Sequence, residues 1–110
     1  MARIYIAGKV TGLKLAELTF KFGGAEKKLM DEGWEVINPL NIVLDKEISW
    51  QGAMKLCLKE LINCEAIYML HDWQESKGAI IEYNLAKVLN IQIYYSTPPT
   101  SAIKDEPKWD

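Results

Sequence analysis

The amino-acid sequence predicts an α/β protein built on a parallel sheet. Short apolar runs, rich in β-branched and aromatic residues, alternate along the chain with longer segments of helical periodicity. Glycine, asparagine, proline or a polar cluster follows each run. Strands that alternate with helices pair in parallel through right-handed crossovers. A length of 110 residues suffices for one such domain with a single core.

The first predicted strand covers residues 2–7 and ends at Gly8. The loop at 8–12 contains two glycines, which let backbone N–H groups approach a ligand, so Gly8 and Lys9 are candidate ligand-binding residues. An ordinary strand-to-helix turn is an equally good interpretation, because the loop has neither a dinucleotide-binding nor a P-loop motif.

A helix is predicted over residues 15–32, with an apolar face formed by Leu18, Phe22, Ala25 and Leu29. Glycine inside a helix costs roughly 1 kcal/mol relative to alanine. The pair Gly23-Gly24 therefore marks either a close approach to the sheet or a break. Gly33 ends the helix, and a second strand follows over 34–37.

The second half of the chain repeats the alternation. After Asn38-Pro39, residues 40–49 form an irregular connection that either walls a pocket or covers the sheet edge. A helix over 50–63 and a strand over 65–70 come next. The apolar face of this helix consists of Trp50, Met54, Cys57, Leu58 and Leu61.

Ser76 is the predicted N-cap of a third helix, which runs to about Leu89 and ends at Asn90. A fourth strand covers 91–95. The domain thus occupies residues 1–95, and the proline-containing segment 96–110 is an extended or flexible tail, in which Trp109 is the residue able to dock. Four parallel strands in the order 2-1-3-4, with helices on both faces, form a three-layer flavodoxin-like (truncated Rossmann-like) fold, whose ligands bind beyond the carboxyl ends of strands 1 and 3.

The composition of the chain argues against several classes of function. Thirteen Lys and Arg against fifteen Asp and Glu, with no basic run, argue against binding of a nucleic-acid polymer. No apolar stretch reaches the ~18 residues of a membrane span. Two cysteines and one histidine do not form a metal cluster, so we expect no metal and no cofactor. The composition is typical of a cytoplasmic protein.

Glu82 is the residue that departs most from the helical pattern. At 100° per residue, its side chain points within about 60° of the stripe that should face the sheet. A buried carboxylate needs a partner or a cavity. It is therefore either paired with Lys9 or capped by hydroxyls, or it serves as a nucleophile or base in a semi-dry pocket.

The start of the third helix is a candidate anion site. Free N–H groups at Ser76, Lys77 and Gly78, with the helix dipole, favour a phosphate there. The alternative is that Ser76 is only a cap and Lys77 is solvated. Trp73 and Tyr5 are either flat walls for a ligand ring or ordinary core and rim aromatics.

These residues resemble those of the nucleoside 2-deoxyribosyltransferase superfamily, and most closely its small branch known as domain of unknown function 4406 (DUF4406). The similarity covers about residues 3–95. It rests on the strand IYIAG, the helix pattern from Phe22 to Gly33 with the following Asn-Pro, and the string DWQESKGAIIE that ends at Glu82.

The resemblance implies a protein that binds a nucleoside or nucleotide. It implies that Glu82 attacks the anomeric carbon of deoxyribose. Ser76 matches the serine of relatives that hydrolyse 5′-monophosphates, and Tyr5 matches a pocket tyrosine of those hydrolases. The family's proton-donating aspartate is replaced by Cys57, so another acid such as Asp72 is needed for catalysis.

Three hypotheses follow from this resemblance. The first is an N-glycosidase or 2-deoxyribosyltransferase acting on a deoxyribonucleoside 5′-monophosphate. The second is a non-catalytic module for a nucleotide or nucleotide-sugar that has lost the general acid. The third is a structural fold with Glu82 in an internal pair. We also expect a homodimer or higher homo-oligomer, with Ile80 and Tyr83 exposed at its interface.

Overall fold

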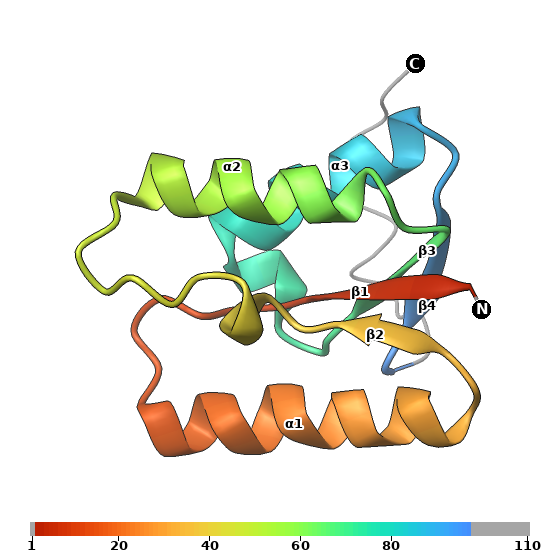
Figure 1. Ribbon diagram of the computed structural model, residues 1–110, viewed down its shortest axis with the longest axis horizontal. Coiled ribbons are helices and arrows are strands. Elements are labelled where there is room, and N and C mark those ends of the chain that lie inside the picture. Colours follow the sequence, from red (N-terminus) through yellow and green to blue (C-terminus); the bar gives the residue numbers. More distant parts are fainter. Residues whose placement is uncertain (1, 98–110) are drawn as a thin grey trace.

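Four short strands pair in parallel in the computed structural model, which describes residues 2–97 (Figure 1). They are β1 (Arg3–Ala7), β2 (Glu35–Ile37), β3 (Ala66–Met69) and β4 (Gln92–Tyr95), and their order in the sheet is β2-β1-β3-β4. Strand β1 pairs with β2 and β3, and β3 pairs with β4, all in parallel. This confirms the flavodoxin-like strand order predicted from the sequence.

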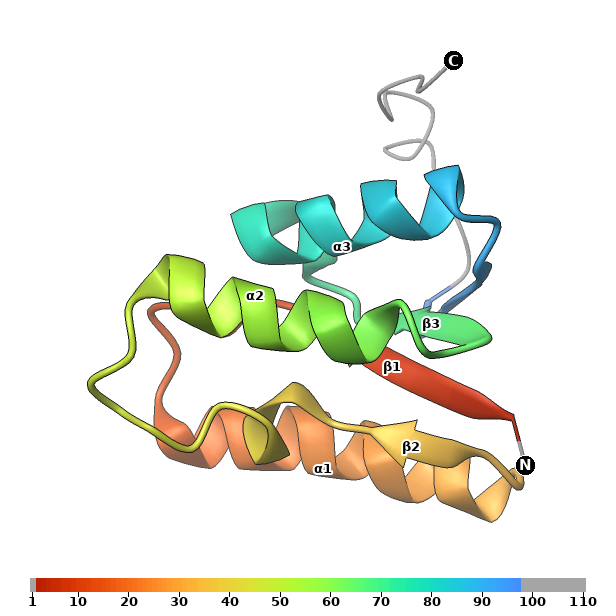
Figure 2. The same ribbon diagram turned by 45° about the horizontal axis from the view of Figure 1, so that its top comes forward.

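The helices cover both faces of the sheet and complete the three layers (Figures 1 and 2). Helix α1 (Leu15–Asp31) lies on one face, and helices α2 (Trp50–Leu61) and α3 (Lys77–Val88) lie on the other. Two short 3-10 turns, η1 (Pro39–Asn41) and η2 (Trp73–Glu75), follow β2 and β3. No helix within residues 2–97 is long and apolar enough to cross a membrane.

Strand β1 divides its side chains between two cores, because successive residues of a strand point to opposite faces. Ile4 and Ile6 pack with Phe22 and Leu29 on the α1 side. Tyr5 instead points to the cluster on the α2 and α3 side. The position of Tyr5 in β1 therefore directs its side chain towards the two helices that carry the candidate site residues.

The predicted helix ends are largely confirmed. The Ser76 hydroxyl accepts a hydrogen bond from the Ala79 N–H at 3.1 Å, which makes it the N-cap of α3. Gly33 follows α1 with φ +97° and Asn90 follows α3 with φ 58°, the left-handed conformation expected at these positions.

Both interpretations of the Gly23-Gly24 pair are wrong. Helix α1 continues through the pair without a break. A Cβ atom added to either glycine would meet nothing within 4 Å, so no close approach to the sheet requires them. The connection before α2 is irregular after η1, and its Ile42 and Val43 pack on the core beneath α2 and α3. Most of the predicted tail, including Trp109, lies outside the described residues.

Candidate functional site

The loops that follow β1 and β3 are joined at the carboxyl ends of the strands, as the strand order predicted. The Lys9 backbone N–H donates to Asp72 Oδ1 at 3.0 Å. A Cβ atom at Gly8 would lie 2.8 Å from Leu70 Cδ1 and 2.9 Å from Leu70 Cβ. Gly8 and Lys9 are therefore held against the residues that lead into the candidate site.

Asp72 forms a buried ion pair with Lys21 of α1, at an Nζ–Oδ2 distance of 2.5 Å. Lys21 Nζ also donates to the Lys9 carbonyl oxygen at 2.6 Å. Burial by itself would raise the pKa of Asp72, but the Lys21 ammonium and the Lys9 N–H together hold it below its ordinary value. This geometry favours an anchoring role for Asp72 over the predicted role of proton donor. Nothing in the local pattern around Lys21 indicates this pairing.

Glu82 is buried, with 5% of its surface exposed, and Tyr5 is its partner. The Tyr5 hydroxyl donates to Glu82 Oε2 at 2.5 Å. Burial raises the pKa of Glu82 to about 7, although the Tyr5 hydrogen bond acts to lower it. Lys9 is not the partner, because its ammonium lies 3.7 Å from Glu75. The sequence thus predicted a buried carboxylate, and the fold supplies a hydroxyl from β1 to pair with it.

Cys57 of α2 completes the buried group around the Tyr5 hydroxyl. The residue is 7% exposed and packs in the same core cluster as Tyr5. Burial raises the pKa of Cys57, and the Glu82 charge raises it further. The thiol is therefore neutral at physiological pH. Cys57, which the resemblance placed at the usual acid position, does lie near Glu82.

The N-terminal ends of α2 and α3 lie side by side (Figure 2). Lys77 Nζ lies 4.8 Å from the ring centroid of Trp50. A Cβ atom at Gly78 would lie 3.0 Å from Met54 Sδ. Trp50, which the helical spacing placed on the apolar face of α2, remains 39% exposed at the rim beside Lys77.

Two aromatic predictions need correction. Trp73 is 6% exposed and stacks on Tyr83 at a centroid distance of 4.4 Å, so it is a core residue and not a ligand-facing wall. Tyr83 is 2% exposed and its hydroxyl lies 3.2 Å from that of Tyr95, so it is not at an exposed interface. Ile80 is also partly buried against the same core. The helical spacing did not account for η2, which packs on this side of α3.

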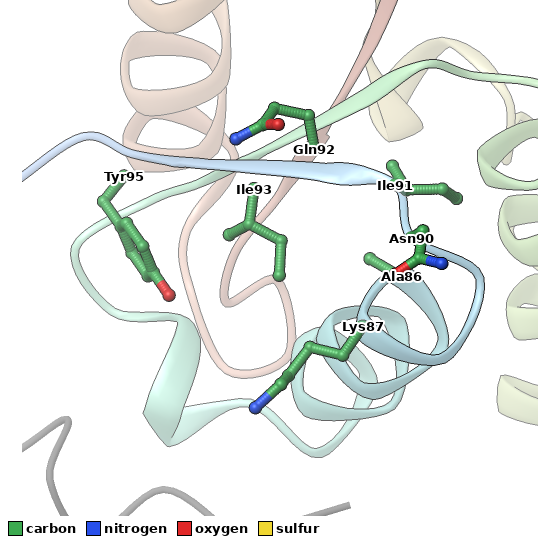
Figure 3. A pocket seen from close by; sticks show the side chains of 7 residues that line it. All are labelled: Ala86, Lys87, Asn90, Ile91, Gln92, Ile93 and Tyr95. Carbon is green, nitrogen blue, oxygen red and sulfur yellow. The ribbon is translucent and has the colours of Figure 1, made fainter.

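A separate groove lies between the C-terminal end of α3 and β4 (Figure 3). Its volume is about 370 Å³. It contains none of the site residues predicted from the sequence. The residues that line it are Ala86, Lys87, Asn90, Ile91, Gln92, Ile93 and Tyr95.

Comparisons with known proteins agree with the fold. A solved structure of the 2-deoxyribosyltransferase from the psychrotolerant bacterium Bacillus psychrosaccharolyticus matches with a TM-score of 0.67 and 19% sequence identity, over 94% of this chain and 81% of that one. This likeness shows a shared fold. Comparison with curated proteins finds no match. A family model matches residues 2–95, and the chain accordingly belongs to the family described as Domain of unknown function (DUF4406).

Proposed function

We propose that this protein binds a deoxyribonucleoside 5′-monophosphate and cleaves or transfers it at the N-glycosidic bond, with Glu82 as the nucleophile. The observation that carries the proposal is the buried Glu82 carboxyl, held by the Tyr5 hydroxyl at 2.5 Å. The similarity of fold to a 2-deoxyribosyltransferase supports the same class of chemistry.

The Tyr5 hydrogen bond orients the proposed nucleophile. Tyr5 engages Oε2, which leaves Oε1 of Glu82 to attack the anomeric carbon. The attack forms a glycosyl ester as the bond from the anomeric carbon to the base breaks, and water or an acceptor base then releases the sugar. With a pKa of about 7, a substantial fraction of Glu82 is the carboxylate that this step requires at neutral pH.

The start of α3 is the proposed site for the 5′-phosphate. The first N–H groups of a helix have no partner within it, and here they belong to Lys77 and Gly78. At a rise of 1.5 Å per residue, Gly78 lies about 6 Å along the axis from Glu82, a span suited to a deoxyribose with its 5′-methylene. The Ser76 hydroxyl accepts from the Ala79 N–H, and its own proton is able to point to a phosphate oxygen.

A specific observation favours the second candidate, a nucleotide-binding module without turnover. The departing base needs a proton. Burial raises the pKa of the Cys57 thiol, and the Lys21 ammonium keeps Asp72 ionised. Neither group is well matched to donate a proton at neutral pH, so binding would persist while bond cleavage is slow.

The test is incubation of the full chain with a panel of deoxyribonucleosides and their 5′-monophosphates, followed by chromatography for the free base. We expect base release from a 5′-monophosphate, its loss in Glu82→Gln, and normal release in Glu47→Gln, a matched change at an exposed glutamate. Saturable binding with no base release would support the binding module instead. No release and no binding would overturn both and leave a structural role for Glu82.

A further inference from the structure

The outward face of α1 has a feature that contacts within residues 2–97 do not explain. Phe20 is 86% exposed, more than any other large hydrophobic residue in the described part of the chain. Gly23 and Gly24 follow within about one turn, and beyond the neighbouring backbone of the helix a Cβ placed on either would meet nothing within 4 Å. Glycines weaken the interior of a helix, and here they create a flat surface beside an exposed aromatic ring.

Helix geometry places these residues on one side of α1. At 100° per residue, Glu17, Gly23, Gly24 and Lys27 all point within about 60° of the direction of Phe20. The buried residues of α1, which are Phe22, Ala25 and Leu29, point the opposite way, into the sheet. Among the helices of the described residues, α1 is the only one on its face of the sheet (Figures 1 and 2).

We infer that this face pairs with α1 of a second copy of the chain, antiparallel about a twofold axis at the level of Phe22. In such a pair, a residue that lies a given number of positions before Phe22 in one copy faces the residue that lies the same number of positions after Phe22 in the other copy. Phe20 and Gly24 each lie two residues from Phe22 in the sequence, so each phenyl ring packs on the glycine surface of the other copy.

The charges on the same face favour this register. Glu17 and Lys27 each lie five residues from Phe22. The twofold axis therefore places Glu17 of each copy opposite Lys27 of the other, which gives two ion pairs across the interface. A parallel arrangement would instead place Glu17 against Glu17. Glu17 has no ion-pair partner in the described part of the chain. Lys27 has only a solvent-exposed ion pair with Asp31, at 3.1 Å. Exposed pairs of this kind contribute little, so this one competes only weakly with a pair between Lys27 and Glu17 of the second copy.

The contact is of modest size. One helix face on each copy is smaller than the ~800 Å² per partner of a standard interface. The dimer is therefore weak and depends on protein concentration. Because α1 and Glu82 lie on opposite faces of the sheet, this association is independent of the proposed function.

Sedimentation equilibrium of the full chain over a wide concentration range tests the inference. We expect a monomer–dimer equilibrium that Phe20→Ala weakens by at least about tenfold. We expect Gly24→Leu to abolish the dimer and yet raise the melting temperature of the monomer, because leucine is a better helix former and the position is open. Val88→Ser, at an exposed position on α3, is the control and leaves association unchanged.

Charge reversal tests the register. Glu17→Lys alone should weaken the dimer, and Glu17→Lys combined with Lys27→Glu should restore it. A parent chain that stays monomeric at every concentration overturns the inference. So does a dimer that Gly24→Leu and the single charge reversal leave intact, since it would use another face.

Discussion

Replacing Glu82 with glutamine should change how stability depends on pH. In the folded chain the Glu82 carboxyl has a pKa of about 7, against an ordinary value of 4.5, because it is buried. Below pH 4.5 the group is protonated in both the folded and the unfolded chain, and it adds no pH dependence. Between these two values the unfolded chain releases the proton while the folded chain keeps it, so stability falls as the pH rises.

The size of the effect follows from the two pKa values. A carboxyl whose pKa rises from 4.5 to about 7 on folding removes about 3 kcal/mol of unfolding free energy once the pH exceeds both values. The Glu82→Gln variant does not titrate, and its side-chain oxygen still accepts from the Tyr5 hydroxyl. Relative to the parent, this variant should therefore gain about 3 kcal/mol between pH 4.5 and pH 8.

Urea unfolding of the parent and of Glu82→Gln at a series of pH values measures this difference. Other titrating groups are present in both proteins, so their contributions cancel in the comparison. Glu47→Gln, at an exposed position, should show a difference that does not change with pH. A pH-independent difference between Glu82→Gln and the parent would refute the reasoning, because it would mean that Glu82 is ionised in the folded chain as readily as in the unfolded one.

Two further predictions concern the loops at the carboxyl ends of β1 and β3. Lys21→Met leaves the buried Asp72 carboxylate without its cation, so urea unfolding at pH 7 should show a loss of about 3 kcal/mol in the free energy of unfolding. This loss should shrink as the pH falls through the pKa of Asp72. A loss below about 1 kcal/mol would mean that the two side chains behave as a surface ion pair. Gly8→Ala forces a Cβ to within 2.9 Å of Leu70 Cβ, and thermal unfolding should show a cost of about 2 kcal/mol. Gly24→Ala, in open space, should instead stabilise the monomer, and equal effects of the two changes would contradict the clash at Gly8.

The candidate site was predictable where a local pattern carried the information. Glu82 fell on the apolar stripe of its helix, which indicated burial, and Ser76 had the identity and position of an N-cap. Both are as predicted. The partners of the buried groups were not predictable, because they are far away in the sequence. Tyr5 lies 77 residues from Glu82, and Lys21 lies 51 residues from Asp72.

The sequence by itself determined the elements and their boundaries to within a few residues, because each element has its own periodicity and its own terminating residue. The alternation of strands and helices then indicated the fold class and with it the strand order. The tertiary structure decided which side chains remained exposed. Helical spacing gives the direction of a side chain but not what packs against it, so Tyr83 was expected at the surface and is covered by Trp73. Phe20 and Gly24 show the converse, because only the packed structure reveals that Phe20 stays 86% exposed and that the space beside Gly24 is open within the described chain.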